Sequence, residues 1–172
     1  MRVEESIMLL KTRHFGEIEV DDEKIITFDA GLPGFEELKD FLIIEGSDDT
    51  SPFKWLQCVS DPQIAFAIAN PFMIVRDYDF EISDEDAARL GIEKGEDIAV
   101  YAIVVVPENP ERMTMNLKAP LIINSRNRKG AQIILDTDKY TVRHYILDEL
   151  RRQEAGTYAC TDKKEEPGHC YK

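Results

Sequence analysis

The feature that most constrains the fold is the run DIAVYAIVVVP at residues 97–107. After Asp97 the run is apolar and rich in β-branched residues, and it stops at Pro107. β-Branched side chains favour strands, and a continuous apolar run is typical of a strand whose two faces are both buried. Proline has no N–H to donate to a ladder and ends such a strand. We therefore expect a central strand covered on both sides.

Most other patterned segments also predict strands. EIEV (17–20) and KIITF (24–28) flank two aspartates and predict a hairpin. The remaining candidate strands are apolar or alternating segments, at 41–45, 53–59, 64–70, 72–75, 76–82 and 131–135. This pattern favours a mainly β fold, an antiparallel or mixed barrel-like single domain with one or two short helices. We place this domain at residues 1–150 and a polar, mobile tail at 151–172.

One helix and one turn are marked by their sequence signals. Ser83 is suited to cap a helix that Gly91 ends, and the acids of the first turn suit the helix dipole. The turn GLPGF at 31–35 is expected to fold Leu32 and Phe35 back as a plug over one edge of the core.

The segment RDYDFEI at 76–82 raises the main functional question. In an extended chain Asp77, Asp79 and Glu81 point one way, while Tyr78 and Phe80 point the other. Like charges in a row repel, so such a row is not expected to serve stability. It is either the solvent-facing side of an edge strand or a surface for a basic partner.

Charge and composition narrow the partners. Against 34 acidic residues there are 21 basic ones, a net charge of −13, which disfavours direct binding of nucleic acid or an anionic membrane. No apolar segment has the length of a membrane span, and the acids in MRVEESIMLL do not suit a signal peptide, so we expect a cytoplasmic protein. We also expect a monomer, and a separate basic hairpin around 125–130.

Two other function classes stay open on the residues alone. A small hydrolase could use a pair of these acids as carboxylates in a barrel mouth. A zinc-dependent adaptor could use Cys160, His169 and Cys170, although no paired-cysteine motif is present. Cys58, His14 and His144 are expected to be structural, and we expect no cofactor, catalytic residue or metal site.

Several stretches in series resemble one family. Their order and spacing match the flagellar assembly factor family called FliW over roughly residues 10–147. The stretches are HFGEIEV (14–20), ITFDAGLPGF (26–35), WLQCVSDPQIAFAIANPF (55–72), YDFEISDED (78–86) and NLKAPLIINSRNRKGAQIILDTDKYTVRH (116–144). Members of the family start near a short strand, which makes Met8 an alternative start.

The resemblance implies a β-barrel-like regulator without catalysis. It implies binding to flagellin and to the RNA-binding translational repressor CsrA, whose antagonism relieves repression of flagellin messenger RNA. The family has no short motif for its binding residues, so the site prediction rests on charge. We expect Asp77, Tyr78, Asp79, Phe80 and Glu81 to bind the partner, with an outward Tyr78 or Phe80 as apolar anchor.

Overall fold

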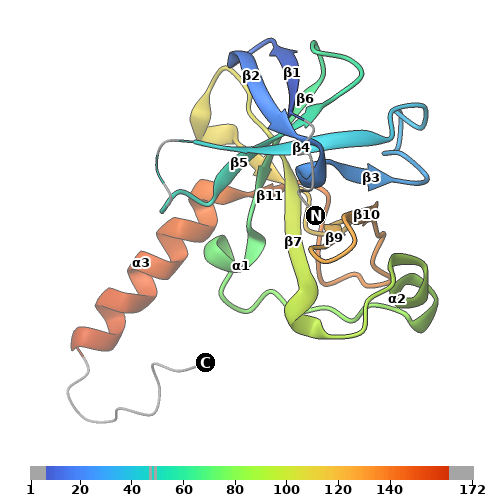
Figure 1. The fold of residues 1–172 in the computed structure, drawn as a ribbon. Helices are drawn as coiled ribbons and strands as arrows, with labels where there is room; N and C mark the ends of the chain where they lie inside the picture. The colour runs from blue at the N-terminus through green and yellow to red at the C-terminus, as the bar shows by residue number, and fades with distance from the viewer. Residues whose placement is uncertain (1–6, 47, 49, 163–172) are drawn as a thin grey trace.

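Seven strands close into a barrel in the computed structural model, which describes residues 7–46, 48 and 50–162 (Figure 1). Around the barrel the neighbours are antiparallel, apart from the parallel pair β3–β10, and the pairing of β9 with β7 closes the ring. The strands in order around the ring are β7 (Ile98–Val105), β6 (Ala65–Ala69), β5 (Phe53–Cys58), β4 (Asp40–Glu45), β3 (Ile26–Phe28), β10 (Lys129–Gln132) and β9 (Leu121–Asn124). The predicted mainly β, barrel-like fold is confirmed.

Strand β7 is the central strand that the apolar run predicted. One edge pairs with β6, and the other pairs first with β9 and then with β8 (Thr114–Met115), which in turn pairs with β11 (His144–Tyr145). Its side chains alternate between two cores. Tyr101 and Ile103 pack into the barrel interior, whereas Ala102 and Val104 are buried in a cluster on the outside. Both faces are therefore covered as far as Val104, as expected, whereas Val105 and Val106 at the end of the apolar run are 60% and 59% exposed.

The turn at 31–35 plugs one end of the barrel. Leu32 is buried with the interior residues, and Phe35 packs edge-on against Phe66, with ring centroids 5.2 Å apart. Gly31 has φ +64° and lies against the backbone of Glu36, so a side chain there would clash. The predicted plug is confirmed for Leu32, while Phe35 stays 37% exposed at the rim.

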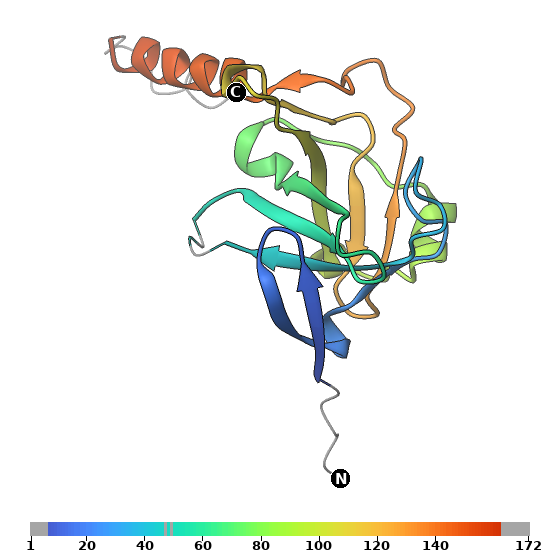
Figure 2. The ribbon, with the colours of Figure 1, turned by 90° about the horizontal axis from the view of Figure 1, so that it is seen from above.

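Segments from both halves of the chain cover the outer cluster (Figures 1 and 2). They include α1 (Pro71–Ile74), α2 (Asp84–Leu90) and the start of α3 (Ile146–Asp162). Ser83 caps α2 and Gly91, at φ +65°, ends it, as predicted. Helix α3 is longer than the short helical end expected after the barrel, and residues 163–172 lie outside the described part of the chain.

Three local predictions were wrong, two of them because tertiary pairing decided the partners or bounds of a strand. Residues 17–20 and 24–28 do not form a hairpin. Strand β2 (Gly16–Asp21) pairs instead with β1 (Ile7–Thr12), and β3 is taken by β4 and β10. The run after Asn70 is helix α1, which Asn70 caps, rather than a strand. The strand expected at 131–135 is β10, which begins and ends earlier.

The expected strand at 76–82 is absent: residues 76–77 form a turn, and residues 78–82 continue without a ladder partner. Two tyrosines hold this segment. The hydroxyl of Tyr78 donates to the carbonyl of Leu117 (2.7 Å). The hydroxyl of Tyr140 accepts from the N–H of Asp79 (2.8 Å) and donates to its carbonyl (3.0 Å). These bonds replace the ladder that the backbone of the segment lacks.

The parallel pair β3–β10 depends on Gly130. A methyl group at that position would lie 2.8 Å from a ring carbon of Phe28, which is fully buried and cannot swing aside. We expect Gly130→Ala to lower the free energy of unfolding by about 1–3 kcal/mol, the usual cost of overpacking a core. Urea denaturation checks this. The matched control is Gly95→Ala, where the added methyl meets no atom within 4 Å. Equal stability of the two variants would contradict the prediction.

Removal of the Tyr140 hydroxyl should loosen the segment that it holds. Tyr140→Phe leaves the N–H of Asp79 without its partner, at a cost of about 1–2 kcal/mol of stability. Faster amide hydrogen exchange at residues 77–81 should accompany that loss. Tyr145→Phe is the control, because that hydroxyl makes no hydrogen bond within the described ranges. Unchanged exchange at 77–81 in Tyr140→Phe would show that the clamp is unimportant.

Candidate protein-binding surface

The acidic row exists in the folded chain, although not as a strand. Asp77, Asp79 and Glu81 are exposed, whereas Tyr78 is only 3% exposed and Phe80 is half-buried. The alternation read from the sequence therefore holds without a ladder. Tyr78 does not face outward, so of the two proposed aromatic anchors only Phe80 reaches the surface.

An aromatic cluster lies directly beneath the row. The rings of Phe72 and Phe80 are nearly parallel, at an interplanar angle of 17° with centroids 6.3 Å apart. Tyr78 contacts both rings and packs edge-on against Tyr140 at 4.7 Å. Phe72 is 46% exposed. Two phenyl rings thus form an apolar shelf at the surface, supported from below by two buried tyrosines.

A shallow groove of about 400 Å³ extends from this shelf. Its apolar walls come from α1, the segment at 78–82 and β7, and Asp79 provides an acid on its wall. The apolar side chains on these walls belong to Phe72, Phe80, Ile82, Ile98 and Val100. We call Phe72, Asp77, Asp79, Phe80 and Glu81 the acidic–aromatic surface. It combines carboxylates with accessible ring faces.

The carboxylates of this surface are not neutralised. Asp77, Asp79 and Glu81 form no ion pair with any residue that the structure describes. Lys139 is a nearby basic side chain whose pKa two of them influence. The neighbouring Tyr140 hydroxyl, and then the charges of Asp79 and Asp77, raise the pKa of Lys139 above its ordinary value. Burial raises the pKa of Tyr78 well above the usual range, so its hydroxyl stays protonated as a donor.

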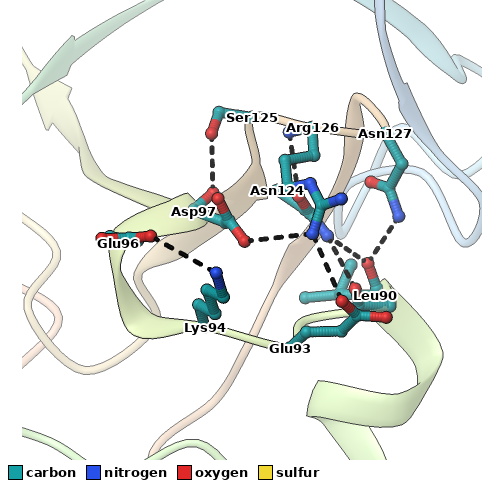
Figure 3. A network of polar contacts seen from close by, with 10 residues as sticks. Leu90, Glu93, Lys94, Glu96, Asp97, Asn124, Ser125, Arg126 and Asn127 are labelled. Atoms are coloured by element: carbon teal, nitrogen blue, oxygen red, sulfur yellow. Dashed lines mark hydrogen bonds and ion pairs between the residues drawn. The ribbon is translucent and has the colours of Figure 1, made fainter.

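The basic hairpin lies against acids instead of apart from them (Figure 3). Arg126 reaches Glu93 (3.3 Å) and Asp97 (3.6 Å). The side-chain amides of Asn124 and Asn127 donate to the carbonyl of Leu90, the last residue of α2. The hairpin therefore caps α2, and its Arg126 pairs with Glu93 and Asp97. Of the basic residues in the expected hairpin, Arg126 is thus paired with acids, whereas Arg128 and Lys129 form no ion pair with a described residue.

A hydrolase of the kind considered above would need a pair of carboxyl groups at the barrel mouth. The described residues that line the mouth do not provide such a pair. The end of the barrel opposite the plug has a cavity of about 480 Å³, which we call the mouth cavity. Among the described residues that line it, Glu45 is the one acid, and Lys54 binds it at 2.6 Å. The half-buried lysine mainly accounts for the lowered pKa of Glu45. This is opposite to the raised pKa that a general acid needs.

The histidines and the cysteine that were considered for catalysis lie in separate places and contact different residues. His14 stacks on Trp55 at 4.7 Å, while His144 pairs with Glu149 at 3.0 Å. Cys58 is fully buried in the barrel interior, as a small core residue. The described residues contain no group of three or more potential metal ligands. The zinc hypothesis concerned the side chains of Cys160, His169 and Cys170, which lie outside the described side chains.

Two members of the site were missed from the sequence. Phe72 was assigned to a strand, and Tyr140 was not considered, since it lies 61 residues from its partner Asp79. The Asn70-Pro71 pair is a recognisable start of a helix and could have placed Phe72 on a surface turn. Nothing in the local sequence could have indicated Tyr140.

No helix within the described part of the chain is both long and apolar enough to cross a lipid bilayer.

Comparisons with known proteins agree on one family. The model of the FliW protein family matches residues 9–146. A flagellar assembly factor FliW from Ruminiclostridium cellulolyticum is 54% identical over 86% of this chain and 99% of its own length. Another from Alkaliphilus metalliredigens is 50% identical over 86% of this chain and 91% of its own.

A solved structure agrees with the sequences. The crystal structure of a flagellar assembly factor FliW superposes with a TM-score of 0.74 at 34% identity, covering 81% of this chain and 96% of the other. A family match over most of the barrel, close sequence relatives and a shared fold lead to one conclusion. This chain belongs to the FliW family.

Proposed function

We propose that this chain is a non-enzymatic flagellar assembly factor that binds its protein partners through the acidic–aromatic surface. The observation that carries the proposal is the presence of three unpaired carboxylates beside two accessible phenyl rings. Relatives named as flagellar assembly factors support the biological setting. Aromatic anchors next to a charged rim are typical of protein interfaces.

The first proposed partner is CsrA, the RNA-binding repressor. A protein that binds phosphate groups is basic, so the carboxylates at 77–81 would attract it. A bound domain with a charge of −13 would repel RNA from the same region. Binding would thus antagonise CsrA and relieve repression of flagellin messenger RNA.

The second proposed partner is flagellin. In this scheme accumulated flagellin captures the factor, CsrA is released, and translation of flagellin slows. The two partners need not use the same residues, and the charge dependence of binding distinguishes them. Binding to CsrA should weaken as salt rises, whereas binding through the phenyl rings should depend little on salt.

Neutralising the acidic row tests the electrostatic part. We expect the triple variant Asp77→Asn, Asp79→Asn, Glu81→Gln to weaken CsrA binding about tenfold at low salt, mostly through a slower association rate. Titration calorimetry and stopped-flow association measure the two quantities. At higher salt the difference from the parent chain should shrink.

A variant of equal charge serves as the control. Glu19→Gln, Glu23→Gln and Glu37→Gln remove three exposed acids that lie outside the surface. If this control weakens binding as much as the triple variant, net charge alone matters and the acidic row has no special role. Unchanged binding in the triple variant would overturn the assignment of the row.

Truncating the shelf tests its apolar part. Phe72→Ala with Phe80→Ala should weaken partner binding by about 1–3 kcal/mol, the range of aromatic hot spots, with little change in salt dependence. Val142→Ala, which truncates another exposed apolar side chain, is the control. Thermal denaturation must show that both variants remain folded. Full binding by the folded double variant would exclude the shelf as an anchor.

A further inference from the structure

One end of the barrel is open, and its wall is incomplete there. The plug at 31–35 closes the far end, whereas the mouth cavity remains accessible. Its walls are apolar and come from four strands, through Ile26, Ile43, Ala99, Tyr101 and Ile123. A cavity of this size accommodates peptide side chains.

The gap in the wall lies along β4. The last pair between β3 and β4 is Ile26 with Phe41. Continuing that register would place residue 24 opposite Ile43 and residue 22 opposite Glu45. Residues 22–24 form a 3-10 turn instead, so β3 has ended where β4 continues. Alternate residues of an antiparallel strand direct their N–H and C=O groups to the same neighbour. The backbone groups of Ile43 and Glu45 therefore face the gap.

Positive charge borders the gap in a chain that is otherwise acidic. Lys24 and Arg128 both line the mouth cavity, and neither forms an ion pair with a described residue. The one acid on the lining, Glu45, is bound by Lys54. The cavity thus combines apolar walls with two cations that form no ion pair with a described residue.

Arg128 has a backbone conformation that favours glycine. Its φ is +59°, in the left-handed region that a side chain disfavours. Its carbonyl accepts from the N–H of Thr27 (2.9 Å), and its own N–H donates to the carbonyl of Asn124 (2.9 Å), so the conformation is fixed. An arginine that adopts this disfavoured conformation beside an apolar cavity indicates a use for its charge.

We propose that the mouth cavity binds an extended, acidic and apolar peptide segment of a protein partner, which pairs with the free edge of β4. The ladder would use the backbone groups of Ile43 and Glu45, as in other cases of strand addition. Alternate apolar side chains would enter the cavity, and a carboxylate would contact Lys24 and Arg128. This site has the opposite charge to the acidic–aromatic surface and is independent of the function proposed for it.

Synthetic peptides test the proposal on the full chain. The probe is a short fluorescein-labelled peptide that alternates valine with threonine and carries two glutamates at one end, and fluorescence anisotropy gives its Kd. A peptide with lysine in place of glutamate should bind on the order of tenfold more weakly, because it meets the two cations. A glutamate peptide N-methylated at the N–H groups that face β4 should lose binding to a similar degree, since it cannot complete the ladder.

Variants of the chain locate the site. Arg128→Gly should weaken binding of the glutamate peptide about fivefold or more without lowering Tm, because glycine adopts φ +59° readily. Lys129→Ala is the matched control, since it removes one charge from the next residue, which does not line the cavity. Amide chemical shifts of Ile43 and Glu45 should move on titration of the parent chain.

Three results would overturn the proposal. If the glutamate peptide does not bind at accessible concentrations, the mouth cavity is not a peptide-binding site. If the N-methylated peptide binds as tightly as the unmodified glutamate peptide, the peptide does not pair with the edge of β4. Equal weakening by Lys129→Ala and Arg128→Gly would reduce the effect to overall charge.

Discussion

The closure of the barrel depends on β7, because this strand must satisfy three neighbours at once. It gives one edge to β6 and divides the other between β9 and β8. Its alternate side chains then fill the interior and the outer cluster together. The outer cluster is built on the paired strands β7 and β9, through Ala102, Val104 and Ile122, and the segment at 75–83 packs on that cluster. The position of the candidate surface thus follows from a backbone pairing far from it in sequence.

The acidic row shows how a segment can stay extended without being a strand. Burial of alternate side chains fixes its orientation, and the Tyr140 hydroxyl satisfies the backbone of Asp79. Such a segment keeps its carboxylates in solvent and places its apolar side on the core. It also leaves no long open edge at the row, which limits unwanted strand pairing there.

Much of the fold could be predicted from the sequence, for reasons visible in particular residues. The apolar run at 97–107, the Ser83 cap and Gly91 end of α2, and the turn at 31–35 each carry their signal locally. The pairing of β2 with β1 could not be predicted, because only a few turn residues separate β2 from β3. That spacing is equally typical of a hairpin between β2 and β3. The candidate site was predicted in part. Alternation at 77–81 placed the acids outside, but the burial of Tyr78 and the contribution of Phe72 depended on packing against distant segments.

Helix α3 gives the molecule an uneven shape. It runs for 17 residues, which at 1.5 Å per residue is about 25 Å. The views in Figures 1 and 2 show it extending away from the barrel. A sphere with an attached rod rotates more slowly about its short axes than about its long one. Backbone N–H vectors in α3 share one direction, so their magnetic relaxation will differ from that of barrel strands even when both are equally rigid. Faster transverse relaxation along this helix is therefore expected from the particle's shape and does not by itself report exchange or association.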